Sequence, residues 1–311
     1  MCTAIRFNER FFGRTFDFER SFGEEIIVTP RDSVRLGQGI NRYGVMGVGV
    51  MHEGTPLYFD GVNEWGLCSA ALNFPRFAVY NSSSGVGVSA SDLNTLVLGL
   101  CRSVSEARDM LSHLQIEGAR EGLDTTPLHW LMADGRESLA VEPLGSGLCL
   151  SDNPVGVLTN SPPLSYHLTR LEDFLALSPA NPAATDGVTL YSRGMGSVGL
   201  PGGFSSSARF VRGAFLRENC PVDTDGTTGG VGQALDILAS VAIPRGAVLS
   251  DGGEPVYTRY SAVVDMERPA YYLTTASCRT VRRLRLSDDL RDGDKIRAFP
   301  LYSEERILEI G

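Results

Sequence analysis

The chain has 311 residues, of which 42% are hydrophobic and 21% are charged, and its formal net charge is −9. This composition is close to the globular average, which excludes a disordered, collagen-like or coiled-coil chain, and the acidic balance disfavours nucleic acid as a partner. No run of 18 apolar residues is present and the N-terminus does not resemble a secretory signal, so we expect a cytoplasmic protein that does not enter a membrane.

The expected elements come in alternating groups of strands and helices. In chain order, we expect strands at 2–7, 44–51, 56–60 and 67–72, helices at 90–100 and 105–114, strands at 138–142 and 156–158, helices at 165–177, 206–219 and 232–241, and strands at 257–264, 270–275 and 280–286. Ser103 followed by Glu106 predicts a cap at the start of the second helix. Because strands within 44–60 and 257–286 follow one another without a helix, the order favours antiparallel sheets and an α+β fold.

Several motifs that could carry chemistry are poorly supported. Residues 194–199 fit G-x-G-x-x-G, but Pro201 and the glycines after it do not open the helix that a dinucleotide site needs. The four histidines show no metal-ligand spacing, which argues against a zinc hydrolase. With neither a dinucleotide motif nor a metal motif supported, we expect no metal and no organic cofactor. No G-x-S-x-G motif is present. A Cys–His pair stays open, because His129 could approach a cysteine in space.

Cys2 differs from the other five cysteines by its position. If Met1 is removed, one residue carries both a thiol and a free α-amine. Their usual pKa values, about 8.5 and about 7.7–8, allow the amine to accept the thiol proton near neutral pH. The residue would then be a nucleophile with its own base. A second-position cysteine with no special role is the alternative that Cys2 alone leaves open.

Longer sequence blocks resemble one known family. Nine segments are similar, in this order, to segments of the choloylglycine hydrolases. They are Cys2-Thr-Ala-Ile-Arg-Phe, Phe12-Gly-Arg-Thr-Phe-Asp17, Tyr58-Phe-Asp-Gly-Val-Asn-Glu-Trp-Gly-Leu67, Leu72-Asn-Phe-Pro75, Leu128-His-Trp130, Val141-Glu142, Gly156-Val-Leu-Thr-Asn-Ser-Pro162, Gly199-Leu-Pro-Gly202 and Ser207-Ala-Arg-Phe-Val-Arg212. That family contains the bile salt hydrolases and the penicillin V acylases, which are N-terminal-nucleophile amidases. The resemblance implies a four-layer αββα sandwich of two antiparallel sheets, formed by residues 1–311 as a single domain with Met1 removed.

The resemblance also assigns roles to residues. It implies that Cys2 is the nucleophile, Arg14 lies beside its sulfur, and Asp17 binds the α-amine. It further implies that Asn160 and Asn73 line the oxyanion hole, and that Arg209 completes the polar network. A pocket for the acyl group would be lined by Phe16, Phe59, Leu123 and Leu128.

The implied reaction is hydrolysis of the amide bond between a bile acid and glycine or taurine. Asn73 favours bile salts over penicillin, while the short segment 76–89 departs from the longer loop of many relatives. Two alternatives are an acylase for penicillin V or an N-acyl homoserine lactone, and a non-catalytic bile- or lipid-binding relative. Family members are commonly tetrameric, which implies a homo-oligomer.

Overall fold

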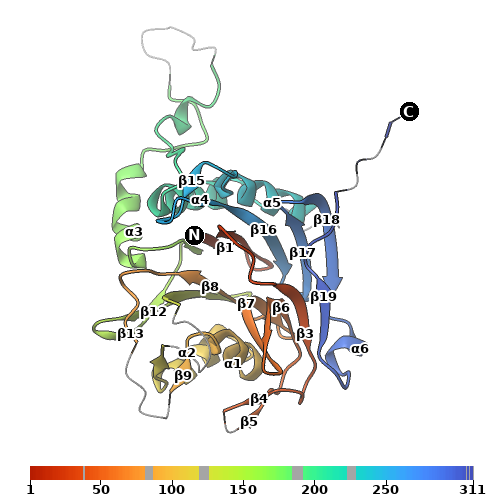
Figure 1. Cartoon of the computed structure of the whole chain (residues 1–311). Coiled ribbons are helices and arrows are strands. Elements are labelled where there is room, and N and C mark those ends of the chain that lie inside the picture. Colours follow the sequence, from red (N-terminus) through yellow and green to blue (C-terminus); the bar gives the residue numbers. More distant parts are fainter. Residues whose placement is uncertain are drawn as a thin grey trace.

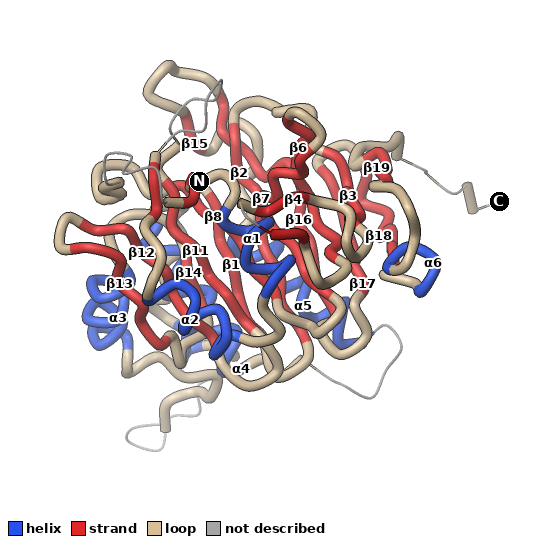
Figure 2. Tube along the Cα trace, turned by 90° about the horizontal axis from the view of Figure 1, so that it is seen from below, coloured by secondary structure: helices blue, strands red, loops and turns tan. Residues whose placement is uncertain are grey.

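The computed structural model describes residues 1–37, 39–80, 87–118, 126–183, 192–222, 229–305, 307 and 309–310. These residues form four layers, with helices above, two stacked sheets in the middle and helices below (Figure 1). This is the α+β sandwich that the resemblance implied. Figure 2, turned by 90°, shows the strands as a continuous block with helices at its faces.

The first sheet contains β1 (Cys2–Arg6) and β2 (Phe11–Phe18), the strands that carry Cys2, Arg14 and Asp17. Its strand order is β14 (Val157–Leu158), β1, β2, β16 (Pro255–Asp265), β17 (Ala270–Thr275) and β18 (Cys278–Arg285), and β15 (Val248–Leu249) pairs with β16. All of these pairs are antiparallel. The N-terminal strand β1 therefore lies inside the sheet, between β14 and β2.

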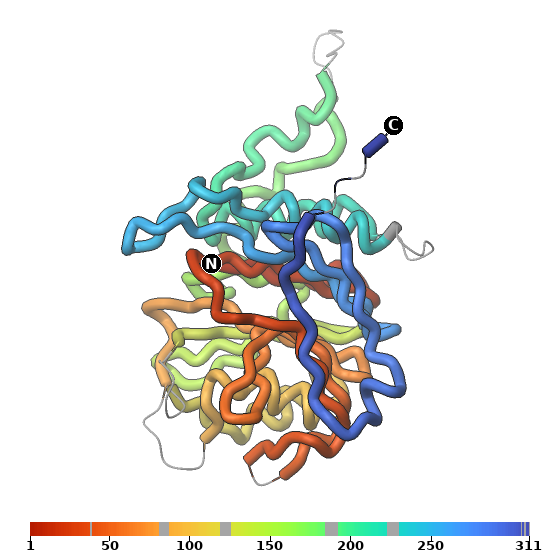
Figure 3. The backbone as a smooth tube through the Cα atoms, turned by 45° about the vertical axis from the view of Figure 1, so that its right-hand side comes forward, coloured from red at the N-terminus to blue at the C-terminus, as the bar shows by residue number. Residues whose placement is uncertain are grey.

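The second sheet has the order β13 (Gly147–Asp152), β12 (Ser138–Leu144), β11 (Leu128–Ala133), β8 (Cys68–Asn73), β7 (Thr55–Asn63), β6 (Val45–His52), β3 (Glu25–Thr29) and β19 (Arg297–Pro300). Its pairs are also antiparallel. After β18 the chain passes through α6 (Asp288–Arg291) and joins this second sheet as β19, a crossing visible in dark blue in Figure 3. Two short ribbons, β4 (Arg35–Leu36) with β5 (Gly39–Ile40) and β9 (Val88–Ser89) with β10 (Ile116–Glu117), lie outside both sheets.

Helices cover the outer faces of both sheets. The helices α1 (Leu93–Leu100) and α2 (Val104–Ser112) pack on the second sheet, while α4 (Ser206–Asn219) and α5 (Gly229–Val241) pack on the first. The helix α3 (Leu164–Leu171) continues into a 3₁₀ turn, Glu172–Phe174, and a further 3₁₀ turn is Met195–Ser197. At α2, Ser103 Oγ accepts the Glu106 amide at 3.2 Å, which confirms the predicted cap.

The main core lies between the two sheets. Side chains from β1, β2 and β16 meet side chains from β6, β8 and β11 there. A second core fills the space between the second sheet and the helices α1 and α2. Most expected elements are present with shifted ends, but strands at 11–18, 25–29, 128–133 and 147–152 were not predicted. Residues 11–17 are buried throughout, so the alternation that reveals a half-exposed strand is absent from β2.

Candidate active site

The strand register determines which candidate residues face each other. Cys2 pairs with Phe16, Ala4 pairs with Arg14, and Tyr260 pairs with Phe16 on its other side. Directly opposed residues on neighbouring strands project to the same face of a sheet. Cys2, Arg14, Phe16 and Tyr260 therefore share the inner face, which looks toward the second sheet. Asp17 lies three positions from Arg14 and projects to the opposite face, so the two do not form an ion pair.

Arg14 is held by a carboxylate from the other sheet. Its Nη1 donates to Asp60 Oδ2 and to the Phe59 carbonyl oxygen, both at 3.1 Å. Asp60 also accepts the hydroxyls of Tyr260 at 2.5 Å and Tyr271 at 2.8 Å. All four of these side chains are buried. The carboxylate therefore has three donors, and the guanidinium is fixed from one side.

The charge of this cluster follows from its contacts. Burial acts against the cation of Arg14, but the groups of Tyr260, Cys2 and Asp60 together raise its pKa above the usual value. Burial raises the pKa of the Asp60 carboxyl, and its three donors act in the opposite direction. We place a positive charge on Arg14 and a negative charge on Asp60, because each of the three donors points a hydrogen at the carboxylate. Arg14 Nη2 is buried without a hydrogen-bond partner among the described residues, and the guanidinium lies close enough to Cys2 for the two groups to interact electrostatically.

Asp17 lies on the outer face of β2 with a different set of partners. Its carboxylate accepts Thr15 Oγ1 at 3.1 Å and Thr258 Oγ1 at 2.5 Å. Its backbone carbonyl accepts the α-amine of Met1 at 2.6 Å, and its backbone amide donates to Met1 at 3.0 Å. With Met1 present, the α-amine is therefore bound by the backbone of Asp17, and no contact with its carboxylate is observed.

Asn160 connects three segments of the site. Its Oδ1 accepts the Cys2 amide at 2.9 Å and Arg209 Nη2 at 2.7 Å, while its Nδ2 donates to the Asn73 carbonyl at 2.7 Å. Arg209 Nη1 donates at 2.6 Å to both the Cys2 carbonyl and Thr3 Oγ1. Burial lowers the pKa of Arg209, and the nearby groups of Asp17 and Cys2 oppose that shift. The structure thus brings Cys2, Asn73, Asn160 and Arg209 into one hydrogen-bonded cluster.

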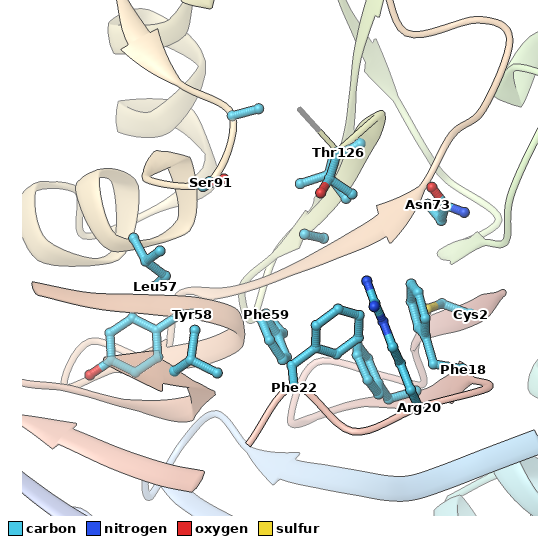
Figure 4. Close-up of a pocket in the computed structure, with 15 residues that line it drawn as sticks. Cys2, Phe18, Arg20, Phe22, Leu57, Tyr58, Phe59, Asn73, Ser91 and Thr126 are labelled. Carbon is cyan, nitrogen blue, oxygen red and sulfur yellow. The ribbon is translucent and has the colours of Figure 1, made fainter. Parts of the chain in front are cut away.

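Cys2 lies at one end of an apolar cavity of about 340 Å³ (Figure 4). The cavity is lined by side chains from both sheets and their connections: Cys2, Phe16, Phe18, Arg20, Phe22, Val50, Leu57, Tyr58, Phe59, Ala71, Asn73, Ala90, Ser91, Thr126 and Leu128. Phe16 stacks on Phe59 at 5.2 Å and on Tyr260 at 5.1 Å between ring centroids. Phe16, Phe59 and Leu128 therefore line the same cavity as Cys2, and Leu123 lies outside the described residues.

His129 is engaged away from the cysteine. Its Nδ1 lies 3.1 Å from Glu142 Oε1, and its Nε2 lies 2.9 Å from the Thr159 carbonyl oxygen. Both ring nitrogens are therefore occupied, and neither is free to act as a base toward Cys2. Within the described ranges, no group of three or more histidine, cysteine, aspartate or glutamate side chains could hold a metal ion. No helix in the described part of the chain is long and apolar enough to cross a membrane.

The sequence reasoning did not identify every residue of the site. Asp60 was read only as part of a family block, yet a carboxylate inside the largely apolar run 57–62 is a pattern that could have indicated a buried partner for a cation. Tyr260, Tyr271 and Arg20 had no comparable pattern, because their roles depend on segments distant in the sequence.

Comparison with known proteins agrees with this geometry. A family model described as linear amide C–N hydrolases, choloylglycine hydrolase family, matches residues 2–297. A bile salt hydrolase/transferase of Lactiplantibacillus plantarum is 37% identical over all of both chains. A solved conjugated bile acid hydrolase variant from Clostridium perfringens superposes with a TM-score of 0.90 and 29% identity, covering both chains fully. A penicillin V acylase from Agrobacterium tumefaciens shares the fold, with a TM-score of 0.78 and 21% identity over 97% of this chain and 92% of that one.

Proposed function

The chain belongs to the choloylglycine hydrolase family of linear amide C–N hydrolases, and we propose that it hydrolyses bile acids conjugated to glycine or taurine. It is an amidase, and its full-length relatives include a bile salt hydrolase/transferase and a conjugated bile acid hydrolase. The observation that carries the proposal is the position of Cys2, which lies at the end of an apolar cavity and is hydrogen-bonded to the Asn160 side-chain amide and the Arg209 guanidinium.

The proposed reaction begins with removal of Met1, which converts the backbone nitrogen of Cys2 into a free amine. That nitrogen lies 2.9 Å from Asn160 Oδ1, which would orient the new amine. The amine takes the thiol proton, and the thiolate adds to the substrate carbonyl carbon. Negative charge then develops on the carbonyl oxygen, and the amides of Asn160 and Asn73 are the donors that we assign to it.

Collapse of the tetrahedral intermediate completes the first half-reaction. The ammonium of Cys2 gives its proton to the leaving nitrogen, the C–N bond breaks, and glycine or taurine departs from a thioester. Water then loses a proton to the amine and adds to the acyl carbon. The C–S bond breaks, the bile acid leaves, and the thiolate with its protonated amine is restored. No metal or organic cofactor takes part in these steps.

Two charged groups support the thiolate in this proposal. Arg14 presents its unpaired Nη2 at the buried cluster and favours the anionic form of sulfur. Arg209 binds the Cys2 carbonyl and fixes the backbone beside the nucleophile. The steroid would lie against the stacked rings of Phe16, Phe18 and Phe59, which offer an apolar surface to a rigid apolar ligand.

The test combines processing with turnover. Intact-mass spectrometry should show a chain that begins at Cys2, and Cys2→Ala should abolish hydrolysis of glycocholate and taurocholate. Cys220→Ser is the matched control, because Cys220 is a half-buried cysteine at the end of α4 and does not line the cavity. Retained hydrolysis in Cys2→Ala would refute the proposal.

The alternatives make different predictions in the same assays. An acylase for penicillin V or an N-acyl homoserine lactone would show its highest kcat/KM on those substrates. A non-catalytic bile- or lipid-binding relative would keep Met1 and bind without turnover. A Cys–His hydrolase would lose activity in His129→Ala and keep it in Cys2→Ser, whereas we expect Cys2→Ser to be the damaging change.

Three further properties belong to this proposal. We expect residues 1–311 to unfold as a single domain, the protein to be cytoplasmic, and the chain to assemble as a homotetramer by analogy with its family. Light scattering after size exclusion measures the assembly directly, and a monomer at micromolar concentration would refute it.

A further inference from the structure

Arg20 is the one charged side chain among the residues that line the cavity in the described part of the chain. It belongs to the connection between β2 and β3 and is exposed at the cavity surface. In Figure 4 its guanidinium extends into the cavity between Phe22 and Phe18. The remaining lining residues are uncharged, so Arg20 is the cation that the cavity wall itself offers to an anion.

The guanidinium of Arg20 is not neutralised by the described protein. Among the described residues it forms no hydrogen bond or ion pair, and its ring contact is with Phe22, whose centroid lies 5.2 Å from Cζ. The same connection carries two carboxylates. Glu24 accepts Ser21 Oγ and the Phe22 amide, both at 2.7 Å, and the neighbouring Glu19 forms no ion pair with Arg20 in the described part of the chain. Arg20 keeps its donors available.

The turn that carries Arg20 is held in place by these same bonds. Glu24 closes residues 21–24 into a turn, and its Oε1 is bound by Tyr302 and lies 3.4 Å from Arg259 Nε. Gly23, with φ of +76°, supplies the left-handed backbone of that turn. The backbone that directly follows Arg20 is therefore held by hydrogen bonds outside the cavity, so mainly the Arg20 side chain has to be ordered when an anion binds.

A chain of ring contacts connects Arg20 to the nucleophile. Phe16 is the cross-strand partner of Cys2, Phe18 stacks on Phe16 at 5.1 Å, and Phe22 meets Phe18 edge-on at 5.0 Å. Arg20 then lies over Phe22. The cation thus flanks the part of the cavity wall that adjoins Cys2, where the amide of a substrate must lie for attack.

We propose that Arg20 binds the carboxylate or sulfonate on the amine portion of the substrate, and so makes this enzyme selective for N-acyl amino acids over neutral amides. The inference rests on the proposed function. In a glycine or taurine conjugate the anion is separated from the scissile nitrogen by one or two carbons, so it must lie close to the nucleophile. A planar guanidinium matches the paired oxygens of either group.

The test compares an anionic substrate with its neutral isostere. With glycocholate and the glycinamide of cholic acid, Arg20→Gln should raise KM for glycocholate about 10-fold with little change in kcat, because the contact is made equally in the ground and transition states. KM for the neutral amide should not change. Arg20→Lys should recover most of the loss, and higher salt should reduce the difference between wild type and Arg20→Gln.

Arg283→Gln is the matched control. Arg283 also lies over an aromatic ring, that of Tyr272 at 6.0 Å, but it belongs to β18 and does not line the cavity. It should leave both KM values unchanged. Equal effects of Arg20→Gln on the two substrates, or no effect on either, would overturn the inference.

A binding experiment separates this inference from the proposed function. Calorimetry with the Cys2→Ala protein compares N-lauroylglycine with N-lauroylglycinamide, neither of which is a bile acid. Weaker binding of the anion alone on Arg20→Gln supports the anion site even if bile salts are not hydrolysed. If bile salts are hydrolysed but Arg20→Gln binds both lauroyl ligands as wild type does, only the anion site is refuted.

Discussion

The Asp60→Asn variant tests whether Asp60, whose role was not predicted from the sequence, positions Arg14. The substitution preserves the shape of the side chain and removes its negative charge. Asp60 is 1% exposed and accepts donors from Arg14, Tyr260 and Tyr271. The change therefore leaves the buried cation of Arg14 without its counter-charge, while one amide oxygen is still available to accept.

The structure sets the size of the effect. Breaking a buried ion pair by removing one partner costs about 3–5 kcal/mol, and the retained amide oxygen places this case near the lower end, at about 3 kcal/mol. For a chain of this size each kcal/mol corresponds to about 2 °C, so Tm should fall by about 6 °C. Arg14 should also lose its fixed position, and kcat/KM should fall about 100-fold, which equals about 2.7 kcal/mol of transition-state stabilisation.

Asp265→Asn provides the matched control. Asp265 is a buried carboxylate that pairs with Arg10 at 2.7 Å, outside the cavity. Calorimetry and steady-state turnover of glycocholate should show a lower Tm for both variants and a lower kcat/KM for Asp60→Asn alone. If the two variants lose stability to a similar extent and both keep full kcat/KM, Asp60 does not position Arg14 for catalysis and the reasoning is refuted.

Three further predictions concern the oxyanion cluster, the stacked rings and a buried histidine. Asn160→Ala should lower kcat about 10²–10³-fold with a small change in KM, because it removes a donor that acts on the developing oxyanion; a normal kcat would contradict that role. Phe16→Ala should cost about 3–5 kcal/mol in urea unfolding and raise KM for bile salts, whereas Phe12→Ala, in the same strand but outside the cavity, should cost stability without raising KM. Burial lowers the pKa of His167 below its usual 6.5, so the unfolded chain binds the proton more readily; stability is complete above pH 6.5 and is lost as pH falls from there toward the lowered value. His167→Gln should flatten that part of a Tm-against-pH curve, and an unchanged slope would show that another group is responsible.

Much of this protein could be predicted from local sequence. The strand 2–7, the helix 206–219 and the cap at Ser103 depend on residues close together in the chain, and all three are present. Cys2 as a potential nucleophile also follows from its position, because a thiol and an α-amine on one residue need no partner. The order of family blocks then indicated the sandwich of two antiparallel sheets.

The strand β2 shows where the pattern was insufficient. It carries Arg14 and Asp17 between two covered faces, so its residues are buried on both sides and apolar alternation is lost. Arg14 and Asp17 are three residues apart, a spacing that suggests an ion pair along a helix. In a strand the same spacing sends them to opposite faces, Arg14 toward Asp60 and Asp17 toward Thr258.

Only the tertiary structure decided which groups complete the site. Tyr260 reaches Asp60 across 200 residues of chain, Arg209 reaches Cys2 across 207, and Arg20 is placed at the cavity by a turn that Tyr302 helps to hold. Such contacts have no local periodicity, because two sheets that stack face to face bring together side chains without regard to their separation in sequence. Cys2 could therefore be proposed as the nucleophile from its position and the family blocks, whereas its electrostatic surroundings depend on the packing of the sheets.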